Sequence, residues 1–473
     1  MTEGNEARLI VAFSIPLLLG NVFQQLYSTV DAMVVGIGVS KEALAAIGVS
    51  LPLICLTISV IMGVSMGGSV VMSQYFGARE PVHLRAAMHT IYAFLLVASV
   101  ITSVLGIALA DPILVFIGTP AAYLDQARVF LQITFSGMVF VFGYNAISSV
   151  LRSLGDSRNP LYFLVFASLL NIGLVLLFVL VLGWGVAGSA WATFFAQAAA
   201  FAASLVFVQR SKDELLHISL RELRIDPEEL RRILRVGLPT ALQMGLVALS
   251  FVALSAIVNP FGTDVMAGYA AASRLDSFAV LPSMNLSIAM SIFVGQNMGA
   301  RRPERVRRAL RATLVLSTAL SLVISALFLL IPDSLNRLFA TDPAVVAHGA
   351  RYLVIVASFY PLFSAMFVLS GLLRGAGAAT FAMASAVVAV WAARIPASFV
   401  LSRIYGADGI WIGIPVGWVI GLGMVAVKYL GGSWKDYRVI GDEAAEGLVA
   451  EAGELAVASE GKDLPCGYGL AEC

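Results

Sequence analysis

The sequence predicts an all-α polytopic membrane protein, with twelve transmembrane helices arranged as two parallel six-helix bundles around a central cleft. Three observations support this prediction. Of the 473 residues, 59% are hydrophobic and only 12% are charged, and the mean hydropathy is +0.90, whereas soluble proteins carry about 25% charged residues. The apolar residues gather in long stretches separated by short polar segments. The second half of the chain also repeats motifs of the first half in the same order.

Twelve apolar stretches are long enough to cross a bilayer, which requires about 20 helical residues. Six of them precede a polar segment in the middle of the chain, and six follow it. In order, the predicted spans are 9–36, 44–75, 88–110, 128–150, 161–183 and 186–208, and then 236–259, 265–298, 312–332, 345–372, 379–402 and 408–430.

The distribution of Lys and Arg predicts the orientation of these spans. With twelve spans and residues 1–440 counted, 22 Lys and Arg residues fall on the side that contains the N-terminus, and 6 fall on the other side. Seven of the 22 lie in 209–235 and six lie in 301–311. Because positively charged residues are retained in the cytoplasm, we expect both termini to be cytoplasmic. With eleven or thirteen spans, the loops rich in Lys and Arg would no longer all fall on the same side of the membrane.

The repeat relates the two halves by a nearly constant offset of about 222 in the numbering. The segment SQYFGAREP at 73–81 returns as GQNMGARRP at 295–303, and LRSLG at 151–155 returns as LRGAG at 373–377. The segment GVAG at 185–188 meets GADG at 406–409, one position off this offset. Each half has an even number of spans, so both copies cross the membrane in the same sense and form parallel repeats.

These observations divide the chain into four parts. Residues 1–208 form an N-lobe with spans one to six, and residues 236–435 form a C-lobe with spans seven to twelve. Between them, 209–235 is predicted to be a cytoplasmic amphipathic linker, in which Asp226 caps a helix. Its arginines either bind anionic lipid headgroups or only fix the topology. Residues 436–473 are predicted to form a disordered acidic cytoplasmic tail, because 441–473 are rich in Glu, Ala and Gly.

Asp31 is the main candidate functional residue, because it lies in the middle of the first span. An ionised carboxylate there costs at least about 2.5 kcal/mol and therefore needs a cavity or a partner. Gln24 and Tyr27 precede it at spacings that place all three side chains on one helical face. Such a carboxyl can load and unload a proton, hold Na⁺ with neutral oxygen donors, or only join two helices by a hydrogen bond. The residues alone leave these roles open.

Two polar residues in neighbouring spans are candidates for the surroundings of Asp31. Asn171 is the strongly polar residue of the fifth span, and Thr193 lies in the sixth. Intramembrane Asn and Thr most often join helices by hydrogen bonds. If they converge on Asp31, they also become part of its ion or proton site.

The second half places different charged residues in its spans. Arg274 and Asp276 lie near the start of span eight, and Arg394 lies deep in span eleven. A deep arginine needs a counter-ion or a water-filled cavity, and Asp276 is the candidate counter-ion. Arg274 and Asp276 could instead lie at the outer membrane interface.

The repeat does not extend to these functional candidates. At the offset of 222, Asp31 corresponds to Ala253, Asn171 to Ala393, and Arg394 to Ile172. We therefore expect a symmetric shell with an asymmetric interior, in which the acid lies in one lobe and the base in the other.

Several other classes of protein are excluded by what the sequence lacks. It contains no Gly-rich loop after a strand and no Gly-Lys-Ser/Thr run for nucleotide phosphates. Its four histidines lack the spacing of a metal site. We therefore expect no enzymatic activity, no cofactor and no resident metal. A net charge of +1 also predicts no nucleic-acid partner.

Several short motifs form a joint pattern that spreads over roughly 1–440. They lie mainly in the first span and the segment after it, with further ones at the ends of spans eight and twelve. The segments are Phe13-Ser14-Ile15-Pro16, Gln24-Gln25-Leu26-Tyr27, Val30-Asp31, Ala43-Leu44-Ala45-Ala46, Gly295-Gln296-Asn297-Met298-Gly299-Ala300 and Trp434-Lys435. Together they resemble the MATE (multidrug and toxic compound extrusion) family, and most closely its bacterial DinF-like branch.

The resemblance implies a secondary antiporter that works by alternating access. It implies export of organic, often cationic, drugs or toxic compounds in exchange for H⁺ or Na⁺. In the DinF-like branch an N-lobe aspartate of the first span couples the ion, and Asp31 occupies its place. Asn171 and Thr193 match the polar partners of that aspartate. Tyr27 and Gln24 match the family's tyrosine and glutamine, which lie one and two turns before that aspartate.

One departure concerns the fifth span. The family often has Asn-Ile-x-Leu-Asp there, whereas this chain has Val175 after Asn171-Ile172-Gly173-Leu174. A second carboxylate is therefore missing from the expected ion site, and more of the coupling falls on Asp31.

Two other functions remain as alternatives at this point. A lipid-linked glycan flippase of the related superfamily would need a cationic cavity, to which Arg274 and Arg394 could contribute. A receptor or scaffold without transport would need a soluble recognition module, which the sequence does not contain. For the antiporter, we expect small organic substrates, the lipid bilayer as surroundings, a monomeric state, and a place in the bacterial plasma (inner) membrane.

Overall fold

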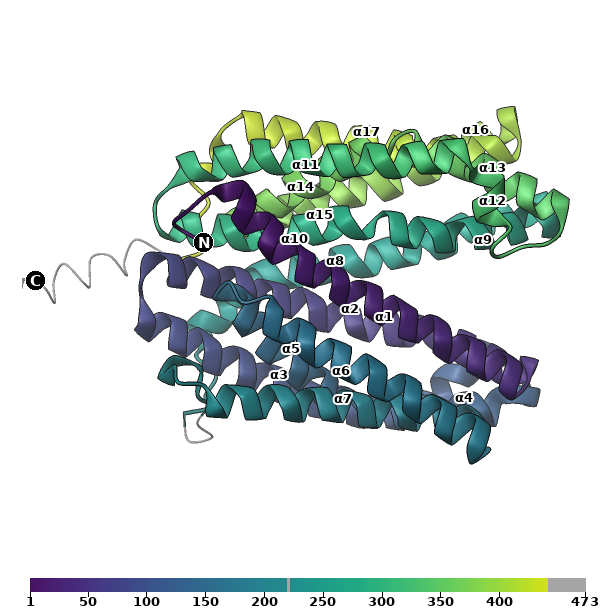
Figure 1. Ribbon diagram of the computed structural model, residues 1–473, viewed down its shortest axis with the longest axis horizontal. Helices are drawn as coiled ribbons and strands as arrows, with labels where there is room; N and C mark the ends of the chain where they lie inside the picture. The colour runs from purple at the N-terminus through teal and green to yellow at the C-terminus, as the bar shows by residue number, and fades with distance from the viewer. Residues whose placement is uncertain (219–221, 441–473) are drawn as a thin grey trace, which may run out of the picture.

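The computed structural model describes residues 1–218 and 222–440, and all regular structure within these ranges is helical. Ten stretches of helix are long and apolar enough to cross a membrane, and two further helix pairs complete one span each with a bend. The all-α class and the twelve spans are therefore confirmed. In Figure 1 the helices of the two halves lie in two bodies, one above the other.

The helices follow one another with short connections. The first half contains α1 (Glu6–Gly38), α2 (Lys41–Ala78), α3 (Pro81–Phe116), α4 (Ala121–Ser136), α5 (Met138–Ser153), α6 (Arg158–Val175), the π-helical segment η1 (Leu176–Val181), α7 (Gly185–Arg210) and the 3₁₀ turn η2 (Glu214–Leu216). The second half contains α8 (Pro227–Val258), η3 (Asn259–Phe261), α9 (Thr263–Ala279), α10 (Leu281–Gly299), α11 (Pro303–Leu330), α12 (Pro332–Asn336), α13 (Pro343–Ala357), α14 (Tyr360–Ala376), α15 (Ala379–Val387), the π-helical segment η4 (Val388–Arg394), α16 (Ile395–Tyr405), α17 (Ala407–Leu430) and η5 (Ser433–Lys435).

Two of the predicted spans are bent. The span expected at 128–150 consists of α4 and α5, which meet at Gly137 with a bend of 41°. The span expected at 345–372 consists of α13 and α14, which are bent by 53° at Ser358 and Phe359. Gly137 and Phe359 are related by the offset of the repeat, so both halves share this bend. Hydropathy does not reveal it, because a break of one or two residues leaves the apolar stretch intact.

The motifs that repeat between the halves are turns with unusual backbone conformations. Arg79 and Arg301 end their helices at φ of 60° and 55°, in the left-handed region that non-glycine residues rarely adopt. The two other repeated motifs place glycines at positive φ, which costs glycine little. These are Gly155 (96°) with Gly377 (109°), and Gly185 (57°) with Gly406 (63°). The sequence repeat is therefore a repeat of the turns that end the spans.

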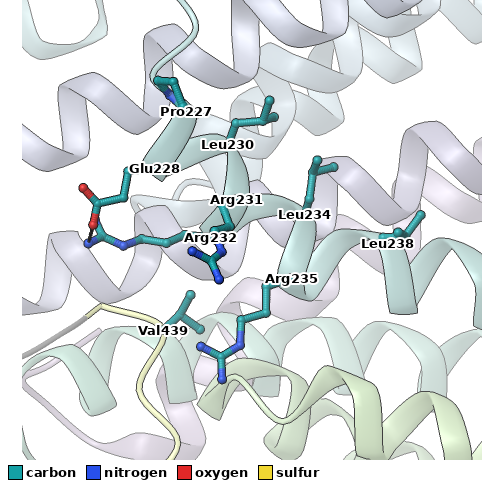
Figure 2. A pocket seen from close by; sticks show the side chains of 9 residues that line it. All are labelled: Pro227, Glu228, Leu230, Arg231, Arg232, Leu234, Arg235, Leu238 and Val439. Atoms are coloured by element: carbon teal, nitrogen blue, oxygen red, sulfur yellow. Dashed lines mark hydrogen bonds and ion pairs between the residues drawn. The ribbon is translucent and has the colours of Figure 1, made fainter.

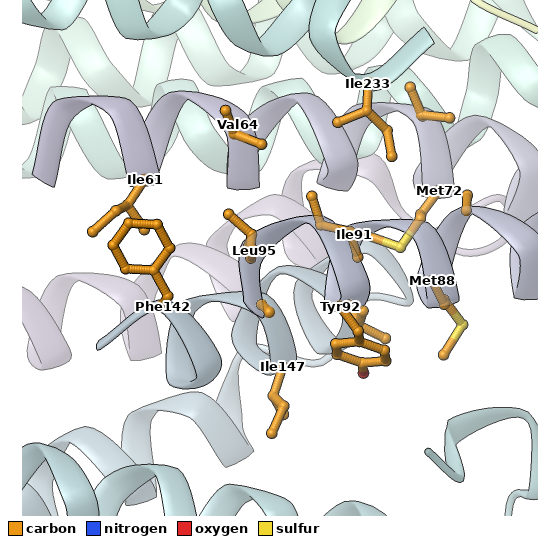
Figure 3. Packing of buried hydrophobic residues seen from close by; sticks show 14 of the residues in the cluster. Ile61, Val64, Met72, Met88, Ile91, Tyr92, Leu95, Phe142, Ile147 and Ile233 are labelled. Atoms are coloured by element: carbon orange, nitrogen blue, oxygen red, sulfur yellow. The ribbon is translucent and has the colours of Figure 1, made fainter. Parts of the chain in front are cut away.

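Helices α1 and α8 each begin inside the opposite lobe. Near the start of α1, Ile10 and Phe13 are buried in a cluster with side chains of α10, α11 and α14, whereas the rest of α1 packs on α6. Near the start of α8, Ile233 and Val236 are buried in the N-lobe cluster. Figure 3 shows Ile233 above side chains of this cluster, and α1 runs obliquely across both bodies in Figure 1. The two lobes therefore exchange the first turns of their first helices.

The predicted linker differs in part from the structure. Asp226 caps α8 as expected, and its carboxylate accepts hydrogen bonds from the backbone N–H groups of Glu228 and Glu229. However, the helix that begins there is not a separate amphipathic element, since α8 runs without interruption through 235 into span seven. Buried contacts with α2 extend the span at this end, so the linker is shorter than 209–235.

The predicted tail also begins later than expected. Residues 436–440 were expected to belong to a disordered tail, but Val439 and Ile440 are 7% and 1% exposed and pack in the N-lobe cluster. The backbone N–H of Val439 donates to Oε1 of Gln74. Two apolar side chains and this hydrogen bond hold the segment in place. Residues 441–473 lie outside the described residues.

The lobes meet closely where α2 crosses α10. A Cβ atom on Gly77 would overlap the carbonyl oxygen of Gln296, and one on Gly299 would overlap that of Gln74. The same glutamines join the lobes by hydrogen bonds. Nε2 of Gln74 donates to the carbonyl of Gly375 (3.0 Å), and Nε2 of Gln296 donates to the carbonyl of Ser153 (2.7 Å). These repeat-related contacts close the lobes together at the end that holds the N-terminus.

Candidate functional site

Asp31 has a direct partner on a neighbouring helix. It lies in α1 and is half-buried, and Oγ of Ser189 on α7 donates to its Oδ1 at 2.7 Å. Ser189 is fully buried. The sequence analysis did not single out Ser189, although it lies one helical turn before Thr193. A hydroxyl donor stabilises the charged form of a carboxylate away from water. The bond from Ser189 therefore offsets part of the free-energy cost of placing an ionised Asp31 in the membrane.

Asn171 and Thr193 bond each other rather than Asp31. Nδ2 of Asn171 on α6 donates to Oγ1 of Thr193 on α7 at 3.2 Å. Since Ser189 and Thr193 are four residues apart, the two pairs occupy adjacent turns of one face of α7. Oδ1 of Asn171 is buried and has no hydrogen-bond partner among the described residues. This leaves an acceptor available next to the predicted ion site.

Gln24 and Tyr27 lie on α1 before Asp31, as their spacing requires. Both side chains are half-buried. The Tyr27 hydroxyl lies beside the side chain of Gln24 and within electrostatic reach of Asp31. The three residues therefore form one polar stripe along α1. The role of this stripe in the substrate cavity stays a prediction.

Val175 shows what replaces the missing second carboxylate. Its side chain is fully buried in a small apolar cluster with Val179 and Ala192. It is followed directly by η1, where π-helical hydrogen bonding replaces the α-helical pattern. Single π turns inside α-helices often mark functional sites. One turn after Asn171, at the position where the family often has an aspartate, the surroundings are therefore apolar.

Ser189→Ala is expected to shift the ion dependence of transport without abolishing transport. The variant removes the donor that stabilises the charged form of Asp31, so half-maximal activity needs a lower proton concentration, by about tenfold. The measurement is transport rate as a function of pH. Ser168→Ala is the matched control, because within residues 1–218 and 222–440 the Ser168 hydroxyl bonds only to the Leu164 carbonyl of its own helix. Equal pH profiles for both variants and the unmodified protein would contradict this role.

Asp276 forms a second polar cluster, within the C-lobe. The Tyr360 hydroxyl donates to its Oδ1 at 2.6 Å, and the Tyr352 hydroxyl donates to its Oδ2 at 3.3 Å. Tyr352 and Tyr360 come from α13 and α14, on either side of the bend in span ten. The sequence analysis missed both tyrosines, since aromatic residues in a span usually serve only packing. Because of this bend, both hydroxyls point toward the Asp276 carboxylate.

Arg394 lies near Asp276, but the two do not form a close ion pair within the described chain. The Arg394 charge acts on Asp276 and on Tyr269. Its guanidinium lies 5.8 Å from the centre of the Phe251 ring, and its buried Nε has no hydrogen-bond partner in the part of the chain that the structure describes. Arg394 is the last residue of η4. Arg394 thus lies near Asp276, as expected for a counter-ion, but the direct hydrogen-bond partners of Asp276 are the hydroxyls of Tyr352 and Tyr360.

Arg274 differs from the residues of this cluster in its exposure. Its side chain is exposed on α9, two residues before Asp276. Successive helical positions two apart do not face each other. Arg274 therefore points to another side of α9 than Asp276 does.

Tyr360→Phe is expected to destabilise the folded protein by about 2 kcal/mol. It leaves a carboxylate without its shortest hydrogen bond in a setting with little water. Thermal unfolding of the purified protein measures the loss. Tyr352→Phe is the control and should cost less, because its bond to Asp276 is longer. In the double variant with Asp276→Asn, the loss from Tyr360→Phe should shrink; full additivity would contradict the pairing.

Comparison with known protein families finds one matching model twice. The family model described as MatE matches residues 16–177 and again residues 239–400. The two matches are separated by nearly the same offset as the repeated motifs, as expected for a duplicated chain. Together they cover more than half of the chain.

Curated relatives match over nearly the whole length. The probable multidrug resistance protein YpnP of Bacillus subtilis is 33% identical over 438 residues, which cover 93% of this chain and 98% of the relative. The probable multidrug resistance protein NorM of Thermotoga maritima is 24% identical over 451 residues, covering 93% and 95%.

Solved structures of similar fold cover the chain equally well. One is described as the outward-facing conformation of a multidrug resistance MATE family transporter of the MOP superfamily; its TM-score is 0.85, with 23% identity and coverage of 92% of this chain and 96% of the other. A structure described as MATE in the bent conformation gives a TM-score of 0.84 with 22% identity, covering 94% and 97%. At this identity the likeness shows the shared fold.

Proposed function

The chain belongs to the MATE family, and from this premise we propose that it is a secondary antiporter that exports organic, often cationic, compounds in exchange for H⁺ or Na⁺. Family membership makes it a multi-pass membrane transporter and not an enzyme. The relatives carry the description multidrug resistance protein. We propose drugs and toxic compounds of that kind as its substrates, with both termini in the cytoplasm of a bacterium.

The observation that carries the proposal is the bond between Asp31 and Ser189. A carboxylate in a membrane span can exist charged and bonded, or neutral after taking up a proton. Na⁺ could use the same carboxylate with the hydroxyl and amide oxygens of Ser189, Thr193 and Asn171. This set provides oxygen ligands, which small hard cations require. Among the described residues, no three His, Cys, Asp or Glu side chains gather as a resident metal site.

The course of α1 suggests how ion binding is linked to a change of conformation. The part of α1 with Asp31 packs on the N-lobe, whereas its first turns pack in the C-lobe cluster. The Asp31–Ser189 bond joins α1 to α7 in the N-lobe. If this bond changes, the contact of α1 with the N-lobe changes, while the first turns of α1 stay packed in the C-lobe. An ion that binds the two lobe arrangements with different affinity shifts their populations, which alternating access requires.

Export from cells tests the proposed substrate class. A drug-sensitive bacterium that produces this protein should retain less of a fluorescent organic cation such as ethidium than the same strain with an empty vector. The difference should vanish when an ionophore collapses the ion gradients. If the protein instead moves a lipid-linked oligosaccharide across vesicle membranes and leaves ethidium unaffected, the alternative of a glycan flippase replaces this proposal.

A further inference from the structure

A groove runs beside the start of α8, apart from the candidate sites in the two lobes. Its volume is about 960 Å³. It is lined by residues of the first turns of α8 and by one residue of the segment that follows η5. Figure 2 shows these side chains, which are Pro227, Glu228, Leu230, Arg231, Arg232, Leu234, Arg235, Leu238 and Val439.

Two arginines give this groove a positive charge that no described residue neutralises by an ion pair. Arg231 and Arg235 are exposed, and neither makes an ion pair or a side-chain hydrogen bond within the described part of the chain. Arg232 between them differs, because its guanidinium bonds to Tyr75 and to Glu229. Glu228 also lines the groove but is paired with Arg232. The charges left for an external ligand are those of Arg231 and Arg235.

The apolar side chains of the groove follow the arginines along the helix. Leu234 lies one turn after Leu230, and Leu238 follows one turn later, inside the membrane-spanning part of α8. Leu238 and Leu242 are 53% and 51% exposed. Positive charge at the helix start and exposed leucines farther along match a ligand with an anionic head and a hydrocarbon chain. A soluble anion would use only the first of these features.

We propose that the groove binds an anionic phospholipid. Arg231 and Arg235 lie four residues apart on one helical face, so both guanidinium groups contact one phosphate. Leu234 and Leu238 contact the acyl chain below it. Basic residues next to a membrane-spanning helix attract anionic headgroups in this way. The groove adjoins the place where Ile233 and Val236 of α8 pack in the N-lobe cluster. The bound lipid therefore stabilises the packing of the first turns of α8 against the N-lobe.

Native mass spectrometry of the purified full chain tests the proposal, with equimolar phosphatidylglycerol and phosphatidylethanolamine as probes. The unmodified protein should retain phosphatidylglycerol preferentially. Arg231→Gln/Arg235→Gln should weaken this preference by about tenfold or more. Arg8→Gln/Arg210→Gln is the charge-matched control, since both arginines are exposed at helix ends, and it should behave like the unmodified protein. Elution as a single folded species in size-exclusion chromatography checks that each variant is intact.

Three results would overturn the proposal. The first is equal phosphatidylglycerol retention in the Arg231/Arg235 double variant and the unmodified protein. The second is displacement of the lipid by inorganic phosphate at equal concentration, which would show that the leucines contribute nothing. The third concerns the acidic residues Asp442 and Glu443, which follow Val439 in the sequence. If only a chain ended after Ile440 prefers phosphatidylglycerol, the tail rather than lipid occupies the groove.

Discussion

Asp31→Asn is expected to reduce ion-driven export to the level of cells that lack the protein. Asparagine has nearly the same size and keeps an oxygen that accepts the bond from Ser189, so the helices can pack as before. It cannot take up or release a proton, and it lacks the charge that holds Na⁺. Ethidium accumulation in a drug-sensitive host measures the loss. Immunoblots of the membrane fraction confirm equal amounts of inserted protein.

The matched control for this variant is Asp276→Asn, which removes a carboxylate from the C-lobe by the same substitution. Because Asp276 is bonded to Tyr352 and Tyr360 and is proposed to serve the substrate cavity, its loss should change the rate or the range of exported compounds. Export that remains should still respond to the ion gradient. If Asp276→Asn removes the response and Asp31→Asn keeps it, the roles of the two lobes are reversed.

Gly77→Leu is expected to produce the largest loss of folded protein among changes outside the polar clusters. Even a Cβ atom at this position would overlap the Gln296 carbonyl oxygen where α2 crosses α10. A backbone atom cannot move aside as a flexible side chain can, so the two helices must separate. Overpacking of a protein interior costs about 1–3 kcal/mol, and separation also lengthens the bonds that Gln74 and Gln296 make across the lobes.

Thermal unfolding and the yield of monodisperse protein measure this effect. Gly423→Leu is the control, because a Cβ atom on this helical glycine of α17 would meet nothing within 4 Å. Both glycines lie in helices of membrane spans, so the cost of replacing glycine itself is matched. A Gly77→Leu protein as stable as Gly423→Leu would show that the crossing is not a fixed contact between the lobes.

The features that could be predicted from the sequence are those that repeat or that depend on composition. Span positions follow from apolar length, and the turns at Arg79 and Arg301 follow from the repeated Gly-Ala-Arg motif. The bends at Gly137 and Phe359 could not be predicted, because the apolar stretch continues across them. The exchange of helix starts was equally hidden, since Ile10 and Ile233 are apolar residues that suit the core of either lobe.

The candidate site was predictable in its charged residues but not in their partners. Asp31, Asp276 and Arg394 are conspicuous because charge is rare in a span. Their partners Ser189, Tyr352 and Tyr360 belong to residue types that are common in spans, and only three-dimensional placement distinguishes them. Asn171 and Thr193 were expected near Asp31 and instead bond each other, one turn from Ser189. Their role in ion coupling stays a prediction.

The most direct test of ion coupling at Asp31 is export of a fluorescent organic cation from proteoliposomes under separately imposed pH and Na⁺ gradients. We expect the unmodified protein to export the cation faster under at least one of these gradients, which also identifies the ion. Asp31→Asn should export no faster with either gradient than without one. Gradient-dependent export by Asp31→Asn at the rate of the unmodified protein would show that Asp31 does not couple the ion.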